Sequence, residues 1–595
     1  MKRSLLSPAR SARMMVGVGA AAAVLASSCA TGPPPPPPPP ANFDFDSAAQ
    51  ADLSMTIEGL TPEPLVVAKA ATGRSIGSWN QTTGDMVTQL TFENGALIVP
   101  IPGTPVGVGY HLAQTADATG NFSPSTGVGN LSVNLKLTVA YVDLGSGASP
   151  IPPPCDVGMT LAMTGAINTL TGALSVTQNG FAVTPPAAAD CGGLGATIGS
   201  LLGGPINSMT ISFSVQAKNR FVATTGTDTG SCSNSGAPCQ TINYAVGQAF
   251  QGETIHVGAG TYPEMVVVDK GLTFEGSNSG HKAGATPQPR LAETVVKGFR
   301  SPGVPHPTSA YTFSATVDGF TIDPQGDAAL IAPNTHHLVA LFGGPNVIVR
   351  NNIFNGGPFD PACEDLCTTM TDSALWVRSG TFVAADNSFT NFRRPIDVNQ
   401  TSPATPVVSG TISDNSFSHI TSRAIWLAEA TWDSGGVYPG ITVSGNNFNS
   451  GAMVSFPAAI VLTTGGNVIS NNTFTDFSQG VIDFVCDGTN AAGASNTIVG
   501  NTFDANRTGI GYLVAGPTAG CLINATIQNN SFLNIIRFGV RWMGAPPVGT
   551  TLNATCNYWG SAAGPEINGT EPDAATADVD VSTWNTSVGD ACSGV

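Results

Sequence analysis

The sequence predicts an all-β protein in which an antiparallel sandwich or barrel is followed by a parallel β solenoid. Three observations lead to this fold class. An Asn-x-Phe motif recurs through the second half of the chain, and apolar and polar residues alternate through the first half. Charged residues make up only 10% of a composition that holds 70 Gly and 44 Pro. Such a composition favours strands and turns over helical bundles.

The chain begins with an export signal. In "MKRSLLSPARSARMMVGVGAAAAVLASSCATG", basic residues precede an apolar run over 14–26 that is too short to span a bilayer. The segment Ala-Ser-Ser-Cys that ends at Cys29 resembles a bacterial lipobox, which predicts a signal peptide over 1–29 and lipidation of Cys29. Ordinary signal-peptidase cleavage after Ala30 is the alternative.

Residues 30–47 are predicted to be a Pro-rich linker. Positions 33–40 are eight consecutive prolines, which adopt extended polyproline II and cannot join a core. At about 3.1 Å per residue this run spans roughly 25 Å. A stiff spacer of this length is expected between an anchored N-terminus and a folded body.

Residues 48–216 are predicted to form a β-sandwich-like domain. Apolar and polar residues alternate in segments such as "LSVNLKLTVAYVDL", which is the period of a half-buried strand. Several such segments separated by turns predict an antiparallel sandwich or barrel. No set of residues in this domain carries recognisable chemistry, so its role stays open.

The Asn-x-Phe motif occurs eight times, the last time as Asn-x-Trp. The pairs are Asn352/Phe354, Asn387/Phe389, Asn415/Phe417, Asn446/Phe448, Asn472/Phe474, Asn501/Phe503, Asn530/Phe532 and Asn557/Trp559. Successive motifs lie 35, 28, 31, 26, 29, 29 and 27 residues apart, and a short apolar segment precedes and follows each one. A period of about 29 residues with short strands and no helix predicts a parallel β solenoid over 217–595.

Stacking of coils explains why the motif repeats. Coils lie one strand spacing apart, about 4.8 Å, so equivalent positions form a column along the solenoid. An Asn in such a column can hydrogen-bond the next Asn and the turn backbone, which satisfies buried amides. The Phe two residues later points to the same side and stacks inside.

Segments at both ends of this region extend the pattern. Residues 242–249 place apolar side chains at helical spacing and predict a short N-terminal cap helix. With the repeats, the entry segment 221–264 and the ending "CNYWGSAAGP" followed by "DVDVSTW" resemble right-handed parallel β-helix proteins of the pectate-lyase-like superfamily, of the exported bacterial type. The resemblance covers about 217–592. It implies a C-terminal capping coil and an Asn turn between the second and third sheets.

The resemblance also implies where a ligand would bind. Substrates of this superfamily, usually acidic polysaccharides, lie along the outer face of the first sheet, which holds the strand after each Phe. If the aligned Ile and Val side chains of these strands point inward, their successors point outward. Aromatic rings stack on sugars, and Asp or Arg bind hydroxyls or carboxylates. The predicted substrate-binding residues are Trp376, Arg378, Asp397, Trp426, Asp483 and Arg541, with Arg393, Arg394 and Glu429 on neighbouring turns.

The catalytic residues are unknown from the sequence. Asp397 and Asp483 are three coils apart in the predicted register, about 14 Å, which is too far for the acid and base of one bond. We therefore expect a protein that binds polysaccharide or mediates surface contact through this face. A polysaccharide lyase or glycoside hydrolase acting in the same groove is the alternative.

No cofactor is predicted with certainty. The densest acidic group comprises Asp360, Glu364, Asp365 and Asp372. We expect surface charge, because these residues lie around the predicted Cys363/Cys367 loop; binding of calcium is the alternative. The sequence contains no paired CxxC motifs and no HxxxH motif of the kind that bind zinc. We therefore predict no metal-binding residues.

Ten cysteines besides Cys29 form an even set, which in an exported chain predicts disulfides. Pairing of sequence neighbours would join Cys155 with Cys191, Cys232 with Cys239, Cys363 with Cys367, Cys486 with Cys521 and Cys556 with Cys592. Spacing alone does not prove this connectivity.

The formal charge of −17 argues against nucleic acid as a partner, because such a partner needs a basic face. The expected partner is a polysaccharide or a cell-surface glycan. Membrane contact is expected only through an N-terminal lipid anchor, and the chain is expected to be a monomer. The expected location is extracytoplasmic, either anchored to the cell envelope or secreted.

Overall fold

A computed structural model describes most of the chain beyond residue 43. The described residues are 44–57, 65–81, 83–99, 106–143, 148–150, 155–197, 207–302, 314–327, 330, 337–340, 346–360, 370–377, 380–400, 408–429, 440–450, 458–463, 465–478, 480–486, 495–514, 525–543, 552–565, 574–575, 579–589 and 592. The predicted signal peptide, Cys29 and almost all of the Pro-rich linker lie outside them. No helix within the described residues has the length and apolarity needed to cross a membrane.

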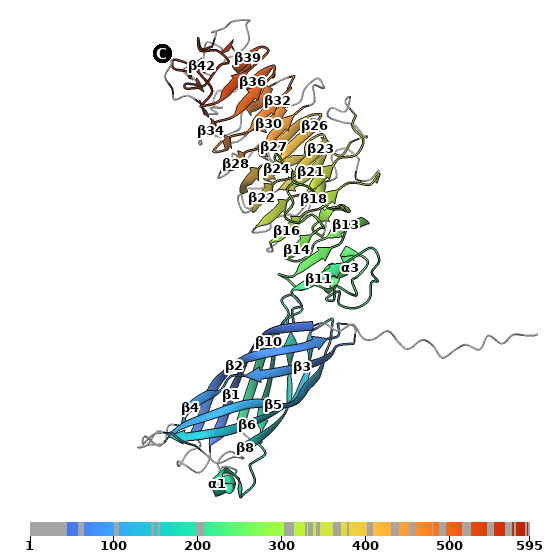
Figure 1. The fold of residues 1–595 in the computed structure, drawn as a ribbon, viewed down its shortest axis with the longest axis vertical. Helices are drawn as coiled ribbons and strands as arrows, with labels where there is room; N and C mark the ends of the chain where they lie inside the picture. The colour runs from blue at the N-terminus through green and yellow to red at the C-terminus, as the bar shows by residue number, and fades with distance from the viewer. Residues whose placement is uncertain are drawn as a thin grey trace, which may run out of the picture. The chain divides into compact units, whose positions relative to one another are not determined.

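The N-terminal part is a closed antiparallel barrel of eight strands (Figure 1). Its strands, in spatial order, are β1 (Asp44–Ile57), β2 (Leu65–Trp79), β3 (Asp85–Phe92), β5 (Val106–Phe122), β6 (Val128–Asp143), β8 (Asp156–Ile167), β9 (Ala173–Phe181) and β10 (Asn207–Ser214). The pairings of β5 with β6 and of β10 with β1 close the ring, while β4 (Gly95–Val99) and β7 (Ala148–Pro150) extend β5 and β6. Of the two predicted architectures, sandwich and barrel, the N-terminal part therefore adopts the barrel.

Alternation fills the barrel with apolar side chains. In β3, Met86, Thr88, Leu90 and Phe92 are buried, while Val87, Gln89 and Thr91 between them are exposed. Leu131 and Val133 of β6 are likewise buried, which confirms the alternation predicted for that segment. Closure removes the unpaired strand edges that an open sheet would expose.

The C-terminal part is a parallel β-helix with three columns of strands. Sheet 2 is the separate thirteen-stranded sheet: β11 (Asn219–Val222), β12 (Thr254–Val257), β14 (Thr273–Glu275), β16 (Ala315–Asp318), β19 (Val347–Arg350), β22 (Thr381–Ala385), β25 (Ser409–Ser413), β28 (Ile441–Ser444), β31 (Val468–Ser470), β34 (Asn496–Val499), β37 (Ala525–Gln528), β40 (Leu552–Asn553) and β42 (Val579–Asp580). Every pairing in it is parallel, so each coil adds one strand in register with the last.

Sheets 1 and 3 share their first strands, β13 (Gly260–Val267) and β15 (Thr294–Arg300), and then separate. Sheet 3 continues as β17 (Thr321–Ile322), β20 (Ile353–Asn355), β23 (Ser388–Phe392), β26 (Ser416–Ile420), β29 (Asn447–Asn449), β32 (Thr473–Thr475), β35 (Thr502–Asp504) and β38 (Ser531–Leu533). Sheet 1 continues as β18 (His337–Ala340), β21 (Ser373–Val377), β24 (Ile396–Gln400), β27 (Arg423–Glu429), β30 (Ala458–Leu462), β33 (Gly480–Cys486), β36 (Thr508–Val514), β39 (Phe538–Met543) and β41 (Ala574–Ala575). The strand after each Phe thus lies in sheet 1, as the resemblance implied.

The predicted Asn column is present at the turn from sheet 2 to sheet 3. The side-chain oxygen of each Asn accepts from the backbone N–H and the Nδ2 of the Asn one coil earlier, without a break from Asn352 to Asn557. Each Nδ2 also donates to a backbone carbonyl of the preceding coil, as Asn472 does to Val443 O at 2.9 Å. The column therefore satisfies buried amides and links every coil to the next.

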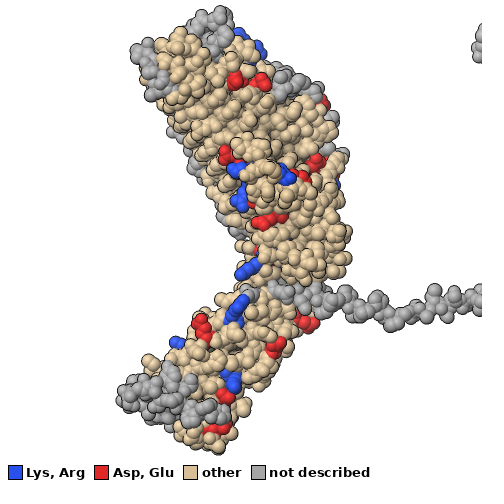
Figure 2. All heavy atoms as spheres, viewed as in Figure 1, with Lys and Arg blue, Asp and Glu red and all other residues tan. Residues whose placement is uncertain are grey.

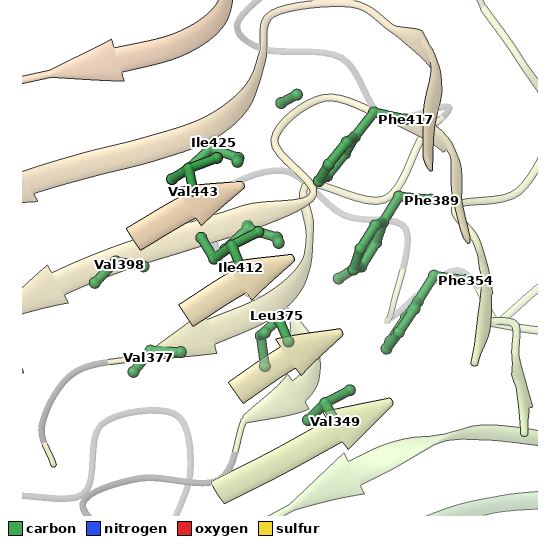
Figure 3. Close-up of a cluster of buried hydrophobic side chains, with 14 of the residues drawn as sticks. Val349, Phe354, Leu375, Val377, Phe389, Val398, Ile412, Phe417, Ile425 and Val443 are labelled. Atoms are coloured by element: carbon green, nitrogen blue, oxygen red, sulfur yellow. The ribbon is translucent and has the colours of Figure 1, made fainter. Parts of the chain in front are cut away.

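The aromatic column runs parallel to it. Ring centroids of successive members, from Phe354 to Trp559, lie 4.6 to 5.0 Å apart and nearly parallel. Figure 3 shows Phe354, Phe389 and Phe417 stacked in this way, beside aliphatic side chains such as Val349 and Ile412. The stack packs the corner of the core that the Asn column closes.

The turn has a backbone requirement as well. The residue before each ladder Asn adopts a left-handed conformation, with φ of 55 to 68°, for example Asp414, Gly445 and Asn471. Asn, Asp and Gly tolerate this region better than other residues. The eighth such residue is Cys556 (φ 60°), which a disulfide fixes.

The N-terminal cap helix, α3 (Ile242–Gln248), is also present, with Ile242, Ala245 and Val246 buried. Three of the predicted disulfides form: Cys155–Cys191, Cys232–Cys239 and Cys556–Cys592. They are consistent with an extracytoplasmic protein. The side chains of the other four predicted partners, Cys363, Cys367, Cys486 and Cys521, lie outside the described residues.

Replacing Asn472 by Ala should destabilise the β-helix by about 3 kcal/mol or more, because several buried groups lose their partners. Asn472 Oδ1 accepts from Asn446 N and Nδ2, and its own Nδ2 donates to Val443 O and Asn501 Oδ1. Urea unfolding followed by circular dichroism measures the change. The neighbouring exposed Thr473→Ala is the control, and equal midpoints for the two variants would refute a stabilising Asn column.

Candidate functional site

Strand pairing in sheet 1 fixes which residues face outward. The inward column contains Leu375, Ile396, Ile425, Ile460, Ile482, Ile510 and Val540 in direct register. Their successors form an outward column of Trp376, Asp397, Trp426, Val461, Asp483, Gly511 and Arg541. The predicted register is therefore confirmed. Figure 2 shows that charged side chains are sparse over the visible surface.

Charged side chains concentrate around β24 and β27. Asp372 is 1% exposed and pairs with both Arg393 Nη1 at 3.1 Å and Arg394 Nη2 at 2.8 Å. Arg394 Nε lies 3.9 Å from Asp397 Oδ2. These four residues form one buried ionic network on the outer side of sheet 1.

Two guanidinium groups lie over the indole of Trp426. Arg394 Cζ is 5.1 Å and Arg423 Cζ is 4.7 Å from the ring centroid. Such cation–π contacts hold a flexible arginine in a defined position. We call Asp372, Arg394, Asp397, Arg423 and Trp426 the sheet-1 site.

Asp397 is the most perturbed group of this site. It is 5% exposed, and its Oδ1 has no hydrogen-bond partner among the described residues. Burial raises the pKa of Asp397 to about 7, with Asp372 acting in the same direction, although Arg394 and Arg423 favour the ionised form. A buried carboxyl with a free oxygen is therefore protonated over part of the neutral range.

Asp483 is a second carboxyl of this kind, three coils further along the outward column. It is half-buried, and its Oδ1 likewise finds no hydrogen-bond partner within the described part of the chain. Burial raises the pKa of Asp483 to about 6, and Arg423 opposes the shift. Gly480 makes room for the carboxylate, since a Cβ there would lie 2.0 Å from Asp483 Oδ1.

The other predicted residues are placed differently. Trp376 points outward but is only 7% exposed and packs against Ala340. Arg541 is half-buried and lies four strands beyond Trp426, away from the sheet-1 site. Arg378 lies outside the described residues, as does the side chain of Glu429. The structure thus brings Trp376, Asp397 and Trp426 together on adjacent strands but does not gather all six candidates.

The surface-charge interpretation of Asp372 is wrong, because this carboxylate is buried and paired with two arginines. Asp360 is half-buried, while Glu364 and Asp365 lie outside the described residues. Within the described ranges, no three or more His, Cys, Asp or Glu side chains are grouped so that they could hold a metal ion. A calcium site at this group therefore stays a prediction.

Sequence reasoning missed Arg423. It stands two residues before the inward Ile425, as Arg394 stands two residues before the inward Ile396, and both precede outward members of the column. Comparing these two positions in the register would have found the pair. What the sequence does not show is that both side chains fold onto the same indole.

Comparisons with known proteins identify no family. No protein-family model matches the chain, and no curated protein matches it. Among solved structures, an alginate lyase from Paenibacillus sp. str. FPU-7 has 13% identity and a TM-score of 0.30, covering 61% of this chain and 99% of its own. The catalytic unit of a thermostable GH87 alpha-1,3-glucanase from Streptomyces thermodiastaticus strain HF3-3 has 12% identity and a TM-score of 0.37. The match covers 88% of this chain and 92% of the glucanase chain. At these TM-scores neither likeness supports an inference about activity.

The buried carboxyl makes the stability of the β-helix depend on pH. The pKa of Asp397 is higher in the folded state (about 7) than the ordinary value of 3.8, so folding favours its protonated form. This contribution is fully present below about pH 4 and is lost as the pH rises through 7. Its full size is on the order of 4 kcal/mol, about three pKa units at 1.36 kcal/mol each.

Asp397→Asn, which keeps the carboxyl shape without the charge, should flatten this dependence. Melting temperatures of the two proteins between pH 5 and 8 would show it: the difference in favour of the variant should grow towards pH 8. A constant difference across this range would contradict a raised pKa at Asp397.

Proposed function

We propose that this protein binds an acidic polysaccharide along the outer face of sheet 1, with the sheet-1 site as its centre. The observation that carries the proposal is the pair of arginines, Arg394 and Arg423, held over Trp426. Two guanidinium groups held beside one aromatic ring attract an anionic sugar, and little side-chain freedom is lost on binding.

The two perturbed carboxyls fit the same ligand. An ionised Asp beside a uronate would repel it, whereas a protonated Asp donates a hydrogen bond from its hydroxyl. The raised pKa values of Asp397 and Asp483 provide the protonated form at mildly acidic pH. Binding of an acidic chain should therefore strengthen as the pH falls from 8 towards 5.5.

The resemblance to the pectate-lyase-like superfamily supports the same face, since substrates of that superfamily lie along the first sheet. The predicted export signal and the three disulfides support an extracytoplasmic protein. Lipidation at Cys29, followed by the Pro-rich spacer, would anchor the binding face to the cell envelope.

Turnover of the polysaccharide is the second candidate function. One observation favours it: a carboxyl with a strongly raised pKa, such as Asp397, is typical of a general acid. The partner it would need is far away, because Asp483 is three strands distant, about 14 Å. Glycosidases place their two carboxyls roughly 5 to 9.5 Å apart, so binding is the function we propose first.

Retention on immobilised polysaccharides tests the proposal. Polygalacturonate and alginate should retain the protein, more strongly at pH 5.5 than at pH 8, and neutral dextran should not. Arg423→Gln should weaken retention roughly tenfold or more, because a charge-assisted hydrogen bond is lost. Trp426→Ala should weaken it through loss of the fixed arginine position.

Lys69→Gln, which removes an exposed cation from the barrel, is the matched control and should behave as the parent protein does. Equal retention on dextran, or unchanged retention of Arg423→Gln, would refute the proposed binding face. Release of unsaturated or reducing ends that disappears in Asp397→Asn would instead establish the enzyme.

A further inference from the structure

Three arginines gather at the C-terminal end of sheet 1. Thr508 of β36 pairs with Phe538 of β39, so Arg507 and Arg537, each one residue earlier, occupy equivalent positions in adjacent coils. Such positions lie one strand spacing apart, about 4.8 Å. The pairing of Gly511 with Arg541 places the third arginine in the outward column of the same strand.

Phe538 holds two of these side chains together. Arg537 Cζ lies 5.4 Å and Arg541 Cζ 5.1 Å from the centroid of its ring. Gly511, the residue aligned with Arg541 on the preceding coil, brings no side chain into the space beside it. We call Arg507, Arg537, Phe538 and Arg541 the C-terminal arginine cluster.

Within the described part of the chain, no carboxylate balances the positive charge of this cluster. Among the described residues, none of the three guanidinium groups makes an ion pair or a side-chain hydrogen bond. Burial lowers the pKa of Arg541, and the charges of Arg537 and Arg507 act in the same direction. This happens in a chain with 39 acidic against 22 basic residues, where carboxylate partners are plentiful.

Uncompensated repulsion between adjacent arginines is relieved by a bound anion. We propose that the C-terminal arginine cluster binds a dianionic tetrahedral oxyanion, such as free sulfate or the phosphate group of a monoester. A carboxylate carries one negative charge and two oxygens, so it would leave part of the charge and many of the N–H donors of three guanidinium groups unpaired. A phosphate or sulfate group carries up to two negative charges and three or more acceptor oxygens, which suits such a cluster.

This site is separate from the proposed polysaccharide face in ligand and in place. Arg541 lies four strands beyond Trp426, roughly 19 Å by the strand spacing. Its ligand is a tetrahedral dianion rather than a uronate. The proposal therefore does not depend on the function proposed above, and either can fail alone.

Calorimetric titration of the full chain with inorganic phosphate, sulfate and glucose 6-phosphate at pH 7.5 tests the site. We expect saturable binding of all three, with acetate at least roughly tenfold weaker. Vesicles of phosphatidylcholine with phosphatidic acid, compared with phosphatidylcholine alone, show whether a lipid headgroup can also supply the group. If the protein binds glucose 6-phosphate but not the phosphatidic acid vesicles, the site takes a soluble phosphate ester. If it binds both, the site also takes a lipid headgroup. Either outcome supports the site.

The variant Arg537→Gln/Arg541→Gln should lose at least tenfold in affinity for phosphate. Arg300→Gln, which removes an exposed arginine from the first coils of the same sheet, is the matched control and should bind as the parent does. Arg423→Gln should also bind phosphate normally, which separates this site from the sheet-1 site. Absence of saturable binding, acetate binding as tight as phosphate, or unchanged affinity in the double variant would overturn the proposal.

Discussion

The Asn column is the constraint on which the rest of the β-helix depends. A parallel coil buries little by itself, and its tight turn from sheet 2 to sheet 3 leaves backbone amides that water does not reach. Each ladder Asn satisfies the preceding coil's turn N–H with its side-chain oxygen and a carbonyl of that coil with its Nδ2. Because a one-residue slip would break all of these bonds, the column fixes the register of every sheet, and sheet 1 with it.

Much of the β-helix was predictable because the interactions that stabilise it recur at a fixed period along the sequence. The Asn column, the aromatic stack and the inward isoleucines of sheet 1 each recur once per coil, so a periodic pattern shows them. The left-handed residues before each ladder Asn, such as Asp414 and Asn471, recur with the same period. By contrast, closure of the barrel depends on the pairings of β5 with β6 and of β10 with β1, and alternation cannot distinguish a barrel from a sandwich.

The candidate site was predicted less completely than the fold, because it depends on contacts that do not repeat. Register alone places Asp397, Trp426 and Asp483 on one face, and the strand pairings confirm that placement. Register does not show that Asp372 and Asp397 are buried, or that Arg423 folds onto Trp426. Nor does register show that Arg541 and Arg537 both contact the ring of Phe538. The repeating coils thus fix where the outward positions lie, and the non-repeating side chains at these positions determine the chemistry of the site.

Distances between spin labels on sheet 2 test the central claim, that equivalent residues stack one strand spacing apart, most directly. Thr316, Thr411 and Thr526 share one outward column of sheet 2, separated by three and then four pairings. With labels at these positions, the account predicts separations of roughly 14 Å between the first two, 19 Å between the last two and 34 Å between the outer two. Separations that do not add along one line would contradict a register fixed by the Asn column, and the binding face on sheet 1 would lose its basis.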